Sequence, residues 1–186
     1  MNIYHATPYD ISAMGFYFKT YEEYFQKAEK HTNAYGQPVE EFEIQFIDGD
    51  NYELFNALRI NQSNLNEWFE TYEDMDDEDA AKVIYIIDHL GYTAHDANDI
   101  QNKLDDIYLF EGTAVEYAEQ YLEETGMLNE IPQHLRYYFD TEAYARDMLL
   151  NGDIAEVEIM NTRYIAMGGW ALILALMAFV NTVLIS

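Results

Sequence analysis

Carboxylates are the side chains of this chain that could carry chemistry, and they gather in two places. One group comprises Asp74, Asp76, Asp77, Glu78 and Asp79, and the other comprises Glu116, Glu119, Glu123 and Glu124. Carboxylates this close together can ligate a hard cation, act as a general acid and base pair, or present negative charge to a basic partner. The residues around them decide among these three uses.

The acidic loops lack the pattern of a calcium site. In a loop counted from Asp74, the sixth position needs glycine and holds Asp79, and the twelfth needs glutamate and holds Tyr85. A loop counted from Asp48 has Glu53 where glycine is required. The five histidines are scattered without metalloprotease spacing and cysteine is absent. We therefore expect no metal and no cofactor.

Signatures of catalysis are also missing. The three serines, Ser12, Ser63 and Ser186, lie in no nucleophile-elbow pattern, and no glycine-rich phosphate loop is present. Among 35 acidic residues, pairs of carboxylates at glycosidase spacing arise by chance and indicate nothing. We expect a protein that is not an enzyme, and a halotolerant enzyme is the third-ranked hypothesis.

The negative charge is spread along the whole chain. Nine basic and 35 acidic residues give a net charge of −26. Segment 1–61 has 10 acidic and 4 basic residues, 62–107 has 13 and 2, and 108–163 has 12 and 3. Such a chain has no basic face for nucleic acid, so we expect no direct nucleic-acid binding. Self-repulsion on this scale destabilises a compact state, so some function must reward it.

Two explanations of the charge remain open at this point. Exposed Asp and Glu keep a protein dispersed, and this is the commoner reason for an acidic composition. The other explanation is that the charge imitates nucleic acid, because duplex DNA carries one charge per ~1.7 Å of axis. The net charge of −26 then corresponds to about 44 Å of helix, or about 13 base pairs.

The elements that must position the carboxylates follow from the pattern of apolar residues. In 1–61, short strands near 2–6, 15–18 and 41–46 flank a helix that Thr20 begins, and a short helix lies at 52–58. The central part, 62–107, reads as helical. Ser63 is expected to cap its first helix.

The first acidic group falls at a helix start, and the second is distributed along a helix that Glu116 helps to begin. Asp76 to Asp79 crowd the first turn of a helix that ends at Gly91, and a further helix runs from Thr93 to about Leu104. Thr113 and Glu116 form a capping box at the head of a helix that Gly126 ends.

The C-terminal part completes an α+β pattern. A strand is expected at 106–110, Pro132 is expected at a first helical position, and a helix capped by Asp140 or Thr141 runs to Leu150. A hairpin at 155–167 turns around Asn161-Thr162. We expect Arg136, Arg146 and Arg163 to pair with carboxylates inside the molecule, and the 17 tyrosines to bury their rings while their hydroxyls stay wet.

An ordered succession of short motifs resembles the ArdA-type antirestriction proteins. The motifs are Phe16-Tyr-Phe-Lys19, residues 33–49, Tyr121-Leu-Glu-Glu-Thr-Gly126, Ile131-Pro-Gln-His-Leu135, Tyr138-Phe-Asp140, Ala143-Tyr-Ala-Arg-Asp147 and Gly152-Asp153. The resemblance implies an elongated, curved α+β protein of three small domains, 1–61, 62–107 and 108–167, that forms a homodimer through the last. It implies imitation of bent B-form DNA in the DNA groove of type I restriction-modification enzymes, blocking restriction and often modification. Such proteins typically travel on mobile genetic elements.

On this hypothesis the nine carboxylates named above project anionic rows toward Lys and Arg side chains that normally hold phosphates. The alternative for any single one is a structural role, which is helix capping in the first group and a solvated face in the second. Imitation would then be a property of the set. The main rival function is an acidic interaction or adaptor module, membrane-tethered or not, that binds a different basic partner.

The chain departs from the family pattern after residue 167. Residues 168–186 contain no charged side chain, and 170–186 are apolar apart from Asn181, Thr182 and Ser186. This is the short edge of the ~17 to 25 residues that cross a bilayer. A C-terminal membrane anchor on a cytoplasmic body is one hypothesis, a helix buried in a dimer contact is another, and an altered reading frame is the third.

Overall fold

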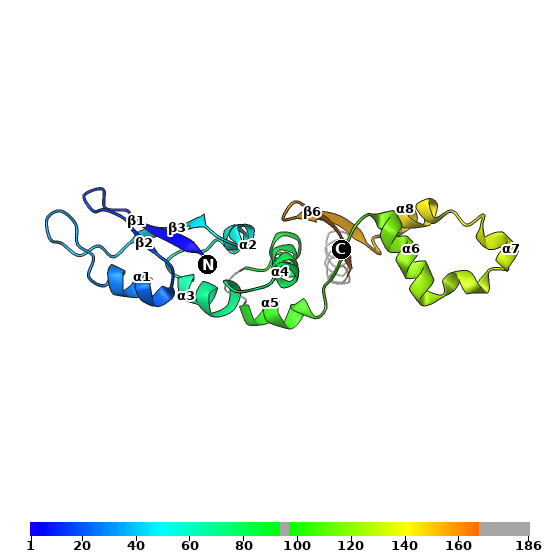
Figure 1. Ribbon diagram of the computed structural model, residues 1–186, viewed down its shortest axis with the longest axis horizontal. Helices are drawn as coiled ribbons and strands as arrows, with labels where there is room; N and C mark the ends of the chain where they lie inside the picture. The colour runs from blue at the N-terminus through cyan, green and yellow to red at the C-terminus, as the bar shows by residue number, and fades with distance from the viewer. Residues whose placement is uncertain (94–96, 168–186) are drawn as a thin grey trace, which may run out of the picture. The chain divides into compact units, whose positions relative to one another are not determined.

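A computed structural model describes residues 1–93 and 97–167 of the protein (Figure 1). The architecture is α+β, as predicted, with two small three-stranded sheets and short helices. The chain divides into two compact units, Met1–Gln101 and a second that begins at Asn102. The first unit contains the expected domain 1–61 and most of 62–107, and the division into three domains stays a prediction.

An antiparallel sheet forms the N-terminal part of the first unit. Its strands are β1 (Ile3–Pro8), β2 (Phe16–Phe18) and β3 (Phe42–Asp48), in the order β2-β1-β3. The following helix, α1 (Tyr21–Ala28), begins at Thr20, whose side chain accepts a hydrogen bond from the Glu23 backbone N–H. The three strands and this cap agree with the sequence pattern.

Helices follow this sheet along the chain. They are α2 (Tyr52–Ala57), α3 (Leu65–Glu67), the π-helical turn η1 (Trp68–Tyr72), α4 (Asp77–Leu90) and α5 (Ala97–Leu104), and the division between the two units falls within α5. Gly91 ends α4 in the left-handed conformation, with φ of 78°. The prediction that Ser63 caps the first helix was wrong. The N–H and hydroxyl of Ser63 both donate to Asn61 Oδ1 in the preceding turn, and α3 begins after Asn64. Helix α5 is described from Ala97, and residues 94–96 lie outside the described residues.

The core of the first unit joins its sheet to its helices. The Tyr4 ring is fully buried and contacts Phe18, Phe46 and Trp68. Trp68 Nε1 donates a hydrogen bond of 2.7 Å to the Tyr4 hydroxyl. This bond and its ring contacts cross the expected boundary at residue 61, so the sheet and the helical segment share one interior.

The second unit packs helices on another antiparallel sheet. Its strands are β4 (Tyr108–Glu111), β5 (Ala155–Ile159) and β6 (Thr162–Met167), in the order β4-β6-β5. Its helices are α6 (Ala114–Thr125), the 3₁₀ turn η3 (Met127–Glu130), α7 (Gln133–Arg136) and α8 (Thr141–Asn151). The core brings Tyr117 and Ala118 of α6 against Met148 of α8 and Ile165 of β6.

Turns in the second unit differ from the prediction by one residue. The hairpin turns at Met160 and Asn161, both with positive φ, because β6 already begins at Thr162. Pro132 precedes α7 at the N-cap and is not its first helical residue. Asp140 is the cap of α8, since its Oδ1 accepts from the Ala143 N–H at 2.9 Å.

The arginine predictions hold for two of three residues. Arg163 pairs with Glu156 at 3.4 Å and Arg146 with Asp147 at 3.6 Å, both in exposed positions where such pairs stabilise little. The expectation was wrong for Arg136, which donates to the backbone carbonyls of Ile131 and Asn129 instead. Carbonyls at the end of a short helical turn need donors, and this guanidinium supplies them.

The expectation of wet tyrosine hydroxyls was wrong in the core. Among the described residues, the hydroxyls of Tyr24 and Tyr72 are buried without a hydrogen-bond partner. Burial raises the pKa of each to about 12. The Tyr4 hydroxyl is also internal, and burial raises its pKa as well.

No helix among residues 1–93 and 97–167 has both the length and the apolar character needed to span a bilayer. The apolar segment 168–186, on which the anchor hypothesis rests, lies outside the described residues.

Candidate functional site

The first acidic group lies where the chain enters α4. Asp76 caps this helix, because its Oδ1 accepts from the Asp79 N–H at 2.9 Å. Glu78 and Asp79 both pair with Lys82, at 2.7 and 3.5 Å. These carboxylates stabilise the helix start, where the dipole favours negative charge. Asp74 and Asp77 remain outside these interactions.

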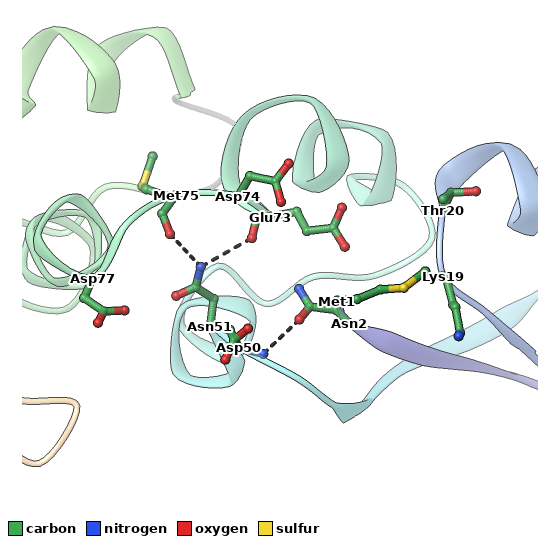
Figure 2. A pocket seen from close by; sticks show the side chains of 10 residues that line it. All are labelled: Met1, Asn2, Lys19, Thr20, Asp50, Asn51, Glu73, Asp74, Met75 and Asp77. Carbon is green, nitrogen blue, oxygen red and sulfur yellow. Dashed lines mark hydrogen bonds between the residues drawn. The ribbon is translucent and has the colours of Figure 1, made fainter.

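Asp74 and Asp77 line a cavity of about 540 Å³ in the first unit (Figure 2). Asp50 and Glu73 add two more carboxylates to its wall, and Lys19 is a basic residue there. The acidic side chains therefore come from two separate segments, the turn after β3 and the turn before α4.

Hydrogen bonds between an asparagine side chain and backbone carbonyls hold these two turns together. Asn51 Nδ2 donates to the carbonyls of Met75, at 2.8 Å, and Glu73, at 3.3 Å, as Figure 2 shows. Asn2 Oδ1 accepts from the Asp50 N–H at 2.8 Å. Gly49 is required beside it, because φ is +126° and a Cβ would lie 2.2 Å from Asn2 Oδ1. These hydrogen bonds thus fix the backbone of the two turns that carry the carboxylates of the cavity.

Glu73 is the functional candidate that the sequence reasoning missed. Its Oε1 accepts a hydrogen bond of 3.0 Å from the Tyr4 hydroxyl, which in turn accepts from Trp68. Partial burial raises the pKa of Glu73, the Tyr4 bond lowers it, and the neighbouring Asp74 charge raises it again. The only sequence signal was its place next to Asp74, because Tyr4 lies 69 residues away along the chain.

The second acidic group lies on α6. Glu116 completes the predicted capping box, since its Oε2 accepts from the Thr113 N–H at 2.7 Å and from the Thr113 hydroxyl at 2.8 Å. These hydrogen bonds lower the pKa of Glu116. Glu124 accepts from Gln120 Nε2 at 2.7 Å. Both side chains are exposed and serve the helix locally.

Glu119 and Glu123 face a different environment one and two turns further along α6. They line a cavity of about 430 Å³ in the second unit, together with Leu122, Leu128 and Arg136. Neither carboxylate is engaged in a hydrogen bond or ion pair within the described residues. They are the counterparts of Asp74 and Asp77 in the first unit.

The nine predicted residues therefore divide by role. Eight are exposed and Asp79 is half-buried. Four are free of local bonds, namely Asp74, Asp77, Glu119 and Glu123, and the other five cap helices or bind neighbouring side chains. In the described ranges, no group of three or more acidic or histidine side chains converges closely enough to hold a metal ion. The arrangement can bind cationic side chains through separate charges.

Fold and site together define a small α+β protein whose surface is anionic and whose cavities are lined by carboxylates. A model of the antirestriction protein family ArdA matches residues 8–160. The chain therefore belongs to the ArdA antirestriction family, which confirms the resemblance found in the motifs. A comparison with curated proteins finds no match. The family match ends before the apolar segment 168–186 begins.

Proposed function

We propose that this protein inhibits type I restriction-modification enzymes by occupying their DNA groove as an imitation of B-form DNA. The observation that carries the proposal is the family match over residues 8–160 in a chain of net charge −26. Inhibition of this kind needs no turnover. It requires only that a groove built for phosphates accept carboxylates in their place.

The free carboxylates suit such a groove best. Asp74, Asp77, Glu119 and Glu123 are exposed and uncommitted, so each can accept hydrogen bonds from a partner's Lys or Arg side chain. Each unit contributes two of them, beside a cavity in both cases. Capping carboxylates such as Asp76 and Glu116 add to the long-range field but have their oxygens partly engaged.

One local cation reduces the field of the first group. Lys82 lies 2.7 Å from Glu78 and 3.5 Å from Asp79, so the three side chains together carry one net negative charge. We infer that Lys82 organises the start of α4 and that the anionic surface toward the partner is made by the neighbouring Asp74 and Asp77.

The proposal also includes the homodimer that the family resemblance implies. Doubling the chain would double the negative charge to the equivalent of about 26 base pairs of duplex DNA. Sedimentation of the purified protein tests this part, and a monomer at the concentrations that inhibit the enzyme would contradict it.

Displacement of labelled DNA from a purified type I enzyme tests the proposed function. We expect release of the DNA at about one protein per DNA site, with weaker competition as ionic strength rises, because the new ion pairs are screened. Absence of displacement at stoichiometric concentration would refute groove occupation and favour an acidic adaptor with another basic partner. Affinity that does not depend on salt would refute imitation by charge.

A further inference from the structure

Two loops lie at one end of the first unit (Figure 1). Both expose large apolar side chains. One is residues 9–15, between β1 and β2, and the other is residues 31–39, between α1 and β3. The exposed fractions are 66% for Tyr9, 103% for Ile11, 84% for Met14 and 82% for Tyr35. We call these four side chains the apolar tip.

A buried asparagine fixes the backbone of the tip. Asn33 is 9% exposed, its Oδ1 accepts from the N–H groups of Tyr35 and Gln37 at 2.9 and 3.0 Å, and its Nδ2 donates to Asp10 Oδ2 at 2.8 Å. The Ala34 N–H donates to the Ser12 carbonyl at 3.0 Å. Hydrogen bonds therefore connect the two loops, and the apolar side chains project from a hydrogen-bonded backbone.

The apolar tip carries no free charge in a strongly acidic protein. Asp10 is the only acidic residue in the two loops, and they contain no Lys or Arg. Its oxygens accept from Asn33, from the Ser12 hydroxyl at 2.7 Å and from the Ser12 N–H at 2.8 Å. These hydrogen bonds lower the pKa of Asp10. The carboxylate is thus committed to loop structure. The nearest exposed charges along the chain are Lys30, Glu40 and Glu41, which flank the second loop.

Exposed aromatic and methionine side chains on a rigid base are the composition of a protein interface core. A phosphate-reading groove offers no partner for them, because phosphate contacts are polar and charged. The tip must therefore meet something other than the residues that hold phosphates.

We propose that the apolar tip docks into an apolar recess next to the basic groove of the same enzyme that the carboxylates engage. This inference rests on the proposed function. Charge complementarity selects this occupant, because a net charge of −26 attracts a basic protein and repels an anionic membrane. A second copy of the chain is already assigned to the homodimer of the proposed function, which forms through residues 108–167 of the other unit. The complex then contains a contact that DNA itself does not make, and this contact distinguishes the inhibitor from the substrate.

The double variant Met14→Ala with Tyr35→Ala tests the tip in the full-length protein. Its matched control is Ile47→Ala, because Ile47 is also an exposed apolar residue, with 48% of its surface accessible. Ile47 lies near the end of β3 at which Asp48 pairs with Ile3. The tip lies beside the other end of β3, at which Phe42 pairs with Pro8. We expect the double variant to bind a type I enzyme roughly tenfold more weakly, by the same factor at low and high salt. The control should bind as the unchanged protein does.

Three results would overturn the proposal. They are unchanged affinity of the double variant, a loss that disappears at high salt, and a change in self-association seen by sedimentation, which would make the tip a contact between copies. The proposed function is judged separately by the unchanged protein. If it displaces DNA and the double variant does so equally well, the tip proposal alone fails. If it does not displace DNA, both proposals fail.

Discussion

The turn before α4 and the length of α6 both carry acidic side chains, yet they use their carboxylates differently. Before α4, the acidic run is compact, partly neutralised by Lys82 and joined through Glu73 to the buried Tyr4. On α6, only Glu116 is engaged at the cap, and the free carboxylates follow at helical spacing along the exposed side. Residues that look alike in sequence thus separate into those that hold a helix and those that are available to a partner.

Neutralising the four free carboxylates should have the largest effect on binding to the enzyme. A variant with Asp74→Asn, Asp77→Asn, Glu119→Gln and Glu123→Gln should displace DNA from a type I enzyme roughly tenfold less well at low salt, because exposed ion pairs contribute about 0.2–1 kcal/mol each. Single changes should have little effect.

The matched control changes the same net charge at engaged positions, with Asp76→Asn, Glu78→Gln, Glu116→Gln and Glu124→Gln. It should bind roughly threefold more weakly, because these side chains are engaged within the molecule and act on a partner mainly through the long-range field. Equal weakening in both variants would show that total charge alone decides binding and would remove the distinction between the two classes.

Removal of the Tyr4 hydroxyl tests the internal anchor that only the first acidic group has. Tyr4→Phe leaves Trp68 Nε1 and the partly buried Glu73 without their partner, so the first unit should lose about 1–3 kcal/mol of stability. Hydrogen exchange measured residue by residue should be faster than in the unchanged protein in the first unit. It should be the same as in the unchanged protein in the second unit. Uniform protection in both units would contradict the role of this network.

Loss of the N-terminal cap should lower the stability of α4 and of α6 by similar amounts. Thr113→Ala removes the capping box of α6, and Asp76→Ala removes the cap of α4, so each should lower the free energy of unfolding by about 1 kcal/mol. Urea denaturation gives the values. A Thr113→Ser variant, which keeps the hydroxyl, should retain most of the stability of α6.

The ionised forms of Glu73 and Glu116 should change the free energy of unfolding in opposite directions. This is the smallest of the expected effects. The pKa of Glu73 is raised on folding, so its ionised form opposes the folded state, and Glu73→Gln should stabilise the protein at neutral pH. This gain should disappear as the pH falls through the Glu73 pKa. The pKa of Glu116 is lowered, so its stabilising contribution is present above the unfolded pKa and lost as the pH falls through the folded pKa.

Unfolding curves of Glu73→Gln and Glu116→Gln between pH 3 and pH 7 would check these signs, where ordinary glutamate has a pKa of about 4.3. Parallel pH dependence in the two variants would contradict the assignment of their environments.

Local features were readable from the sequence because their partners are close in the chain. The capping box joins Thr113 to Glu116. Strand β3 follows from the alternation of polar and apolar residues, and β1 and β2 follow from aromatic and β-branched residues between turn formers. The carboxylates that crowd the start of α4 were predicted for the same reason, since the helix dipole acts within one turn. Family membership followed from the order of the motifs along the chain.

A feature that depends on a distant partner was not readable. Tyr4 and Glu73 are 69 residues apart, and no local pattern marks Glu73 as different from Asp74.

Two local predictions failed because several partners compete at short range. Ser63 has the residue type of a cap, but its hydroxyl donates to Asn61 in the preceding turn. Arg136 was expected to pair with a carboxylate, but it donates to the nearby carbonyls of Ile131 and Asn129. Residue type alone does not decide which of several nearby acceptors a donor takes.

The position of Tyr4 in the middle strand of the first sheet bears on how the chain acquires its shape during translation. Strand β1 is synthesised before β3, its neighbour on one side, and before residue 68, which supplies the indole partner of its tyrosine. The aromatic face of β1 therefore stays uncovered until synthesis has passed Trp68. Ribosome-bound chains halted before and after Trp68 would differ sharply in resistance to protease.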